Sequence, residues 1–171
     1  MPAHIMTPEL TVPTKRSAGI LMYRRRHGEV EVLLVHPGGP FWQNKDEGVW
    51  SIPKGLYEDD EDASLAARRE FEEETGSRAD GALVALGSFR QPGGKMVTAF
   101  ALEADFDVAS LRSNTFDLEW PPRSGRSATF PEVDRAEWLS PPAARRKLLK
   151  GQLPVLEALL AYLRSGGSDP G

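Results

Sequence analysis

The 171-residue sequence contains no cysteine, which excludes disulfide bonds and thiolate metal sites. A chain without cysteine is compatible with a reducing compartment, so we expect a cytoplasmic protein. No apolar run is long enough to cross a bilayer, and we expect no membrane partner. Basic charge is not in excess either, because the net charge is −4 and nucleic-acid-binding surfaces are usually basic. We therefore expect no nucleic-acid partner, whereas small anionic ligands stay possible because a bound metal can invert the local field.

The length and composition fit one globular domain. An apolar content of 40% with both charge signs well mixed is typical of a folded domain with its own core. We assign this domain to residues 16–165, preceded by a flexible arm over residues 1–15 and followed by a flexible tail over residues 166–171. Both a monomer and a homodimer are compatible with this organisation.

Turn residues divide the domain into segments that resemble strands or helices. The predicted strands cover residues 17–25, 30–36, 49–52, 82–90, 95–104, 115–120 and 134–139. The predicted helices cover residues 62–75, 143–150 and 153–164. Loops over residues 36–48 and 121–131 separate some of these segments, and long loops in a compact domain are often functional. The pattern predicts an α+β or mixed α/β fold with a mixed sheet.

The predicted helix over residues 62–75 carries a concentration of acids near its end. The stretch REFEEETG (Arg69–Gly76) places four carboxylates in five consecutive residues. Like charges at helical neighbour spacing repel each other, so something must offset this repulsion. At 100° per residue, Glu70 and Glu74 share one face and Glu73 lies beside them, whereas Glu72 points elsewhere.

The face of Glu70 and Glu74 is predicted to point inward, because alanine residues continue it toward the start of the helix and permit close packing on a sheet. Inward-facing acids without enough bases are costly. A hard divalent cation with oxygen ligands, Mg²⁺ above all, removes that cost. The alternative is a solvent-exposed acidic helix with ion pairs, such as the pair that we expect between Arg68 and Glu72.

Together with the loop before it, the acidic helix resembles the Nudix box. That box has Gly, five residues, Glu, seven residues, Arg-Glu, an apolar residue, any residue, Glu-Glu, any residue, Gly and an apolar residue. Gly55, Glu61 and Arg69–Gly76 fill every fixed position, with Phe71 in the first apolar slot. Only Ser77 departs, in the final apolar slot, which concerns the packing after the helix. A match at so many fixed positions is far more specific than a lone glycine pattern.

The resemblance to Nudix hydrolases implies a role for each matching position. It implies that Glu70, Glu73 and Glu74 bind Mg²⁺, often joined by the main-chain carbonyl of Gly55, and that Mn²⁺ can substitute. It also implies that Arg69 orients a box glutamate, so the expected catalytic residues are Glu70, Arg69 and Glu73. The implied fold is a mixed β-sheet sandwiched between α-helices.

The general base is assigned less directly, because some family members use a box glutamate and others a glutamate from a later loop. Glu70 is our first choice. Glu119 and Glu132 flank the loop over residues 121–131 and are the later-loop candidates, although both read more simply as surface acids. Glu61 matches a glutamate with a structural role.

The residues before the Nudix box provide a prediction of the substrate class. The segment WSIPKG (Trp50–Gly55) resembles the entry segment of Nudix members that act on diadenosine polyphosphates, diphosphoinositols and related nucleotides, and Lys54 is expected to contact a phosphate. Phe41 and Trp42 either stack on a nucleobase or pack within the loop. Loop arginines are further candidate phosphate contacts, although most such side chains are simply solvated. They are Arg90, Arg123 and Arg126.

The resemblance predicts a Mg²⁺-dependent hydrolase whose partner is a small-molecule nucleotide. The expected reaction is cleavage of the pyrophosphate linkage of a nucleoside diphosphate joined to another moiety, with a diadenosine polyphosphate as the first choice. One alternative is a pyrophosphohydrolase that removes oxidised nucleoside triphosphates such as 8-oxo-dGTP. Another is an inactive regulatory module that binds a nucleotide, but such a module need not keep costly buried acids.

Overall fold

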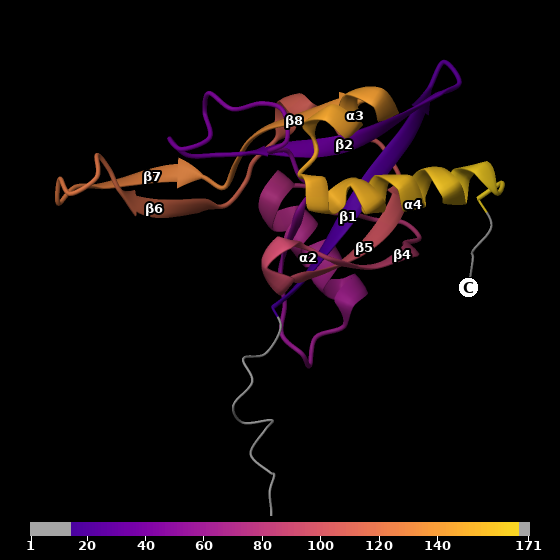
Figure 1. Cartoon of the computed structure of the whole chain (residues 1–171), viewed down its shortest axis with the longest axis horizontal. Helices are drawn as coiled ribbons and strands as arrows, with labels where there is room; N and C mark the ends of the chain where they lie inside the picture. The colour runs from indigo at the N-terminus through magenta and orange to yellow at the C-terminus, as the bar shows by residue number, and fades with distance from the viewer. Residues whose placement is uncertain (1–14, 168–171) are drawn as a thin grey trace, which may run out of the picture.

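The computed structural model describes residues 15–167 (Figure 1). The arm expected over residues 1–15 therefore lies outside the described residues except for Lys15, and so does most of the tail expected over residues 166–171. Within the described part, a six-stranded sheet is covered by helices on both faces. The predicted mixed α+β class with a sandwiched sheet is confirmed.

Strand β1 (Arg16–Arg26) forms the centre of the sheet, and its middle residues are buried on both faces. Continuous apolar runs of this kind are typical of strands that are covered on both sides. Its hairpin partner β2 (Glu29–Pro37) follows a turn in which His27 and Gly28 both have positive φ, 54° and 78°. Two such residues in succession match the right-handed twist of the strands, so the strands predicted over residues 17–25 and 30–36 form a hairpin.

The strands of the main sheet run in both directions. Their order is β4-β5-β1-β2-β8, with β3 paired to β1. β1 is parallel to β5 and antiparallel to β2 and β3, while β2–β8 and β4–β5 are also antiparallel. The remaining bounds are β3 (Lys54–Leu56), β4 (Val84–Arg90), β5 (Met96–Glu103) and β8 (Val133–Leu139).

Helix α2 (Ala63–Thr75) covers one face of the sheet, and α3 (Pro141–Lys147) and α4 (Leu153–Arg164) cover the other (Figure 1). The alternation along β1 explains this, because Ile20 packs with α2 residues and Leu21 packs with α3 and α4 residues. Short 3₁₀ turns complete the connections, namely Pro92–Gly94, Val108–Ser110 and Lys150–Gln152. In residues 15–167, no helix combines the length and apolar character needed to cross a membrane.

The ends of α2 follow from its capping residues. Asp62 accepts hydrogen bonds from the backbone N–H groups of Ser64 and Leu65, and Gly76 ends the helix with φ of 82°. Glycine is favoured at this position because a side chain is strained in the left-handed region. The predicted bounds of this helix are confirmed, so the box acids lie on the last two turns of a helix that packs against the sheet.

Two local predictions are wrong. The loop expected over residues 121–131 ends earlier, because Ser127–Pro131 forms strand β7, which pairs with β6 (Thr115–Glu119) in a separate two-stranded ribbon. The strand expected over residues 49–52 is reduced to isolated bridges, Val35 with Ser51 and Trp50 with Leu148. A side chain adds to these backbone contacts, since Ile52 N–H donates to the buried Gln152 at 2.9 Å.

Candidate active site

A cleft of about 240 Å³ opens beside the end of α2. Its polar lining includes Lys54, Glu74 and Glu132, and Trp42 contributes an aromatic wall. The remaining lining is largely apolar and comes from the strand and loop residues Val35, Pro37, Val49, Ser51, Val133 and Leu149. Four segments that are distant in the sequence thus meet around one cavity, which is the usual form of a small-molecule site.

Lys54 and Glu74 lie together at this cleft. The backbone N–H of Lys54 donates to Oε1 of Glu74 at 3.3 Å. Burial raises the pKa of the Glu74 carboxyl to about 8, although the positive charge of Lys54 opposes the rise; the nearby charges of Glu132 and Glu70 add to it. Burial also lowers the pKa of Lys54, and the Glu74 charge opposes that change. Without a bound cation, this part of the site therefore disfavours the ionised forms of all its carboxyl groups at once.

Glu74 is half-buried, whereas Glu70 is buried and only 8% exposed. Burial, followed by the charge of Glu73, raises the pKa of Glu70, while the hydrogen bond from Arg69 Nη1 at 2.8 Å lowers it. Gly55 lies directly against this carboxylate, and a Cβ built on Gly55 would overlap it. Glycine is therefore required here for close approach, and the β3 backbone comes next to the acid as the box resemblance implies.

Arg69 joins the acids of the box. Its Nε and Nη2 atoms donate to both oxygens of Glu61, at 3.0 and 2.9 Å, in a two-pronged arrangement. This contact holds the pKa of Glu61 below its usual range. A weaker contact of 3.4 Å reaches Glu73. Arg69 thus contacts Glu61, Glu70 and Glu73 at once, which fits an orienting role.

The candidate ligand set has the chemistry that Mg²⁺ prefers. Glu70, Glu73, Glu74 and the Gly55 carbonyl supply only oxygen atoms, and burial raises the pKa values of the buried Glu70 and the half-buried Glu74. A bound cation would stabilise their charged forms, so the donor set fits the ion. As the side chains stand, no three acidic or histidine groups within residues 15–167 converge into a closed metal cluster. The carboxylates must reorient to enclose an ion.

The remaining predicted residues are divided between the cleft and the surface. Trp42 lines the cleft, whereas Phe41 does not line it and lies edge to face against Trp120, with ring centroids 5.5 Å apart. Glu132 lies at the cleft, but Glu119 accepts a hydrogen bond from Gly125 N–H on the ribbon. The arginines Arg90, Arg123 and Arg126 are exposed and outside the cleft lining.

The expected ion pair between Arg68 and Glu72 is wrong. Arg68 donates to the main-chain carbonyls of Ala79 and Gly81, at 2.5 and 2.7 Å. It thereby fastens the segment after α2 to the helix. Glu72 is exposed, as its position on the helix predicts.

Two buried polar residues escape the sequence-based prediction. Gln152 donates to Ser51 Oγ at 3.0 Å and accepts from Ile52 N–H, so it holds the segment that leads to Lys54. His36 is fully buried between Asp134 and the carbonyl of Lys45, at the end of the loop that carries Trp42. Three of these contacts join residues that are 98, 100 and 101 positions apart, and no local spacing in the sequence signals such pairs.

The family model of the NUDIX domain matches residues 13–159, so the chain belongs to the NUDIX domain family. Nudix hydrolase 7 from Arabidopsis thaliana is 32% identical over 128 residues, which cover 68% of this chain and 43% of that protein. The chain spans less than half the length of the curated relatives that it matches. The resemblance found in the box is confirmed.

Solved structures share the fold. An Ap4A hydrolase from C. elegans, in a binary complex, has a TM-score of 0.60 at 20% identity, covering 89% of this chain and 99% of that one. The NUDIX domain of NrtR from Shewanella oneidensis, complexed with ADP ribose, has a TM-score of 0.64 at 15% identity, covering 92% and 94%. At such identities the similarity establishes the fold alone.

Proposed function

We propose that this protein is a Mg²⁺-dependent hydrolase that cleaves the pyrophosphate linkage of a nucleoside diphosphate joined to another moiety, and that its substrate is a diadenosine polyphosphate. The observation that carries the proposal is the meeting of Lys54, Glu74 and Trp42 at one cleft, on the helix end that also carries the buried Glu70. A phosphate-binding cation, a metal-binding carboxylate and an aromatic surface are the groups that a nucleotide polyphosphate requires.

In this proposal, Glu70, Glu73, Glu74 and the Gly55 carbonyl hold Mg²⁺. The ion supplies charge neutralisation at the phosphates and lowers the pKa of a water molecule bound to it. Arg69 keeps the carboxylates oriented through its contacts of 2.8 and 3.4 Å with Glu70 and Glu73.

The remaining groups act on the proton and the substrate. Glu70 accepts the proton of the attacking water as general base; the position of Glu132 at the cleft supports it as the alternative. Lys54 contacts a phosphate as a point charge, and Trp42 stacks on a base. Mn²⁺ can replace Mg²⁺ in this scheme, and the protein acts in the cytoplasm as a monomer or homodimer.

The segment before the box favours a dinucleotide as the substrate, and the fold is compatible with one. The segment Trp50–Gly55 resembles the entry segment of enzymes that act on diadenosine polyphosphates. An Ap4A hydrolase is also among the solved structures that share the fold. A second fold neighbour is complexed with ADP ribose, so that compound belongs in the test as a competitor.

The test is a comparison of diadenosine tetraphosphate, 8-oxo-dGTP, ADP-ribose and ATP under identical Mg²⁺, with the products separated by charge. We expect the highest kcat/KM for diadenosine tetraphosphate. A clear preference for 8-oxo-dGTP would instead assign the protein to the removal of oxidised nucleotides. Nucleotide binding without any turnover would support an inactive regulatory module.

A further inference from the structure

The β6–β7 ribbon projects from the body of the domain (Figure 1). Its two strands pair only with each other, and isolated ribbons of this kind are marginally stable in water. One face is polar, since Thr129 donates to Asp117 at 2.7 Å. The other face carries the cross-strand aromatic pair Phe116 and Phe130, with ring centroids 6.0 Å apart. Because the ribbon projects from the body of the domain, packing in the main core does not explain its apolar face.

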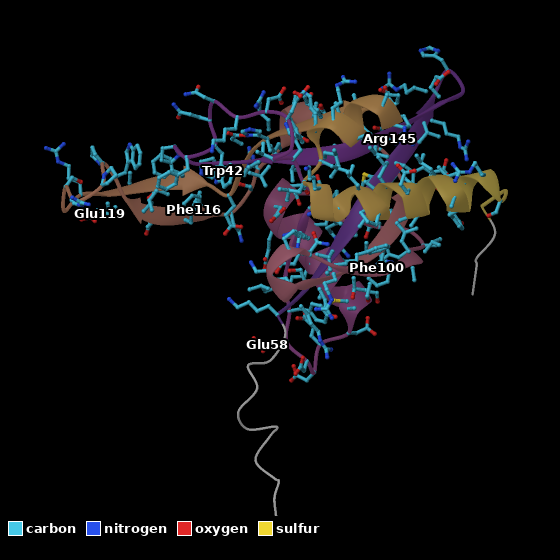
Figure 2. The ribbon with its side chains drawn as sticks, in the orientation of Figure 1. Trp42, Glu58, Phe100, Phe116, Glu119 and Arg145 are labelled. Atoms are coloured by element: carbon cyan, nitrogen blue, oxygen red, sulfur yellow. The ribbon has the colours of Figure 1, made fainter. Side chains whose placement is uncertain are left out.

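The loop before Trp50 runs along this ribbon and connects it with the cleft. Gly39 lies beside Phe116, since a Cβ built on Gly39 would come to 3.0 Å from the Phe116 ring, and Phe41 packs edge to face on Trp120. The next residue, Trp42, lines the cleft, and Figure 2 shows it close to the ribbon that carries Phe116. Consecutive residues of one loop thus present one aromatic ring to the cleft and another to the ribbon.

The outer aromatic surface is accessible. Phe41 is 58% exposed although its edge-to-face contact with Trp120 fixes its position. An exposed aromatic ring in a fixed position can serve as a stacking surface for nucleobases.

Two arginines lie at the tip of the same ribbon, next to Trp120. Arg123 and Arg126 are exposed, and neither makes an ion pair with any residue of the described part of the chain. Arg123 also has φ of 60°, a conformation that a non-glycine residue rarely adopts and that recurs at binding sites. The tip is braced, because Gly125 N–H donates to Glu119 and Trp120 N–H donates to the Arg126 carbonyl.

We propose that Phe41, Trp120, Arg123 and Arg126 form a second binding site, which takes the distal nucleoside of a dinucleoside polyphosphate together with its nearest phosphate. The base stacks on the Phe41 and Trp120 surface, and the guanidinium groups contact the phosphate. The cleft then holds the other nucleoside on Trp42, with the polyphosphate between the two sites. This inference rests on the proposed function, because it assumes a substrate with two nucleosides.

Binding measurements on a catalytically impaired Glu70→Gln background test the site. Dissociation constants are measured for ATP and for diadenosine polyphosphates of two to five phosphates. The Arg123→Ala/Arg126→Ala and Trp120→Ala changes should each raise the dissociation constant of diadenosine tetraphosphate roughly tenfold, which is the scale of one lost stacking or charge-assisted contact. The value for ATP should stay unchanged, and the effect should grow with the number of phosphates.

A matched control is the double change Arg25→Ala/Arg26→Ala, which removes two exposed arginines from the β1–β2 hairpin. Trp120→Phe keeps a ring beside Phe41 and should preserve most of the affinity, which separates stacking from loss of the ribbon. Equal effects on ATP and the dinucleotide, or equal effects of the two arginine pairs, would overturn the site. Failure of wild-type protein to hydrolyse diadenosine tetraphosphate is a different result, which contradicts the proposed function while the binding data still decide the subsite.

Discussion

Nδ1 of the buried His36 lies 2.7 Å from Oδ1 of Asp134. The other ring nitrogen, Nε2, lies 2.6 Å from the main-chain carbonyl of Lys45. Each ring nitrogen therefore lies within hydrogen-bond distance of one oxygen atom. The ring therefore ties β2 and β8 to the loop that carries Trp42, and it packs edge to face on Trp50 at 5.2 Å.

His36 thus acts as a clamp between Asp134 and the loop carbonyl of Lys45. This clamp predicts different outcomes when His36 is replaced by asparagine or by glutamine. Asparagine can replace the Nδ1 donor toward Asp134 but is too short to reach Lys45, whereas glutamine extends toward Lys45. We expect His36→Asn to speed hydrogen exchange in residues 38–48 and raise KM, with little change in kcat. His36→Gln should retain more protection in this loop.

The control is His27, an exposed histidine in the turn between β1 and β2. The His27→Asn change should leave hydrogen exchange in residues 38–48 unchanged. Equal loop protection in His36→Asn and wild-type protein would contradict the clamp. Either His36 variant should also lower the free energy of unfolding by about 0.5–1.5 kcal/mol, because each loses one of the two hydrogen bonds of a buried side chain.

Substitutions of the α2 acids should affect kcat differently according to the face of the helix on which each acid lies. Glu70→Gln and Glu74→Gln should each lower kcat at least about a hundredfold, a typical loss for a general base or an electrostatic contribution. Glu72→Gln should be nearly silent, because Glu72 is exposed and Arg68 bonds to carbonyls instead. Steady-state kinetics on the three variants measure this. A Glu72→Gln defect as large as that of Glu70→Gln would contradict the assignment of the ligand face.

The pKa of Glu74, raised to about 8 from 4.5, predicts the pH dependence of stability in the metal-free protein. Between these values the folded chain keeps a proton on Glu74 that the unfolded chain releases. The free energy of unfolding must then fall as the pH rises through this window. Urea denaturation in the presence of a chelator measures the slope.

The Glu74→Gln variant should flatten this slope, whereas Glu72→Gln should keep it. Mg²⁺ should raise the stability of the wild-type protein most at the alkaline end, where Glu74 is charged without compensation. A slope that persists unchanged in Glu74→Gln would assign the titration to another group.

Much of the fold could be predicted because its signals are local. Asp62 and Gly76 define the ends of α2, and the 100° rotation per residue correctly placed Glu70 inward and Glu72 outward. The apolar run in residues 17–25, the turn at His27 and Gly28 and the alternation in residues 30–36 predicted two adjacent strands, which form the first hairpin.

The errors have long-range causes. Ser127–Pro131 is a short segment that contains a proline, and it becomes a strand only because residues 115–119 lie opposite it. The pairs of His36 with Asp134 and of Gln152 with Ile52 connect positions 98 and 100 residues apart, so only the assembled sheet brings them together. The choice between Phe41 and Trp42 as the cleft residue depended in the same way on the ribbon that engages Phe41.

The most direct test of the proposed chemistry is hydrolysis of diadenosine tetraphosphate by the wild-type protein, followed by charge separation of the products with Mg²⁺ and after exhaustive chelation. We predict that two phosphorylated halves form only with the cation, and that the rate rises at mildly alkaline pH because the attacking water must lose a proton among carboxylates. Restoring Mg²⁺ or supplying Mn²⁺ should restore the reaction. Hydrolysis that survives chelation, or its absence with the cation present, would contradict the central claim.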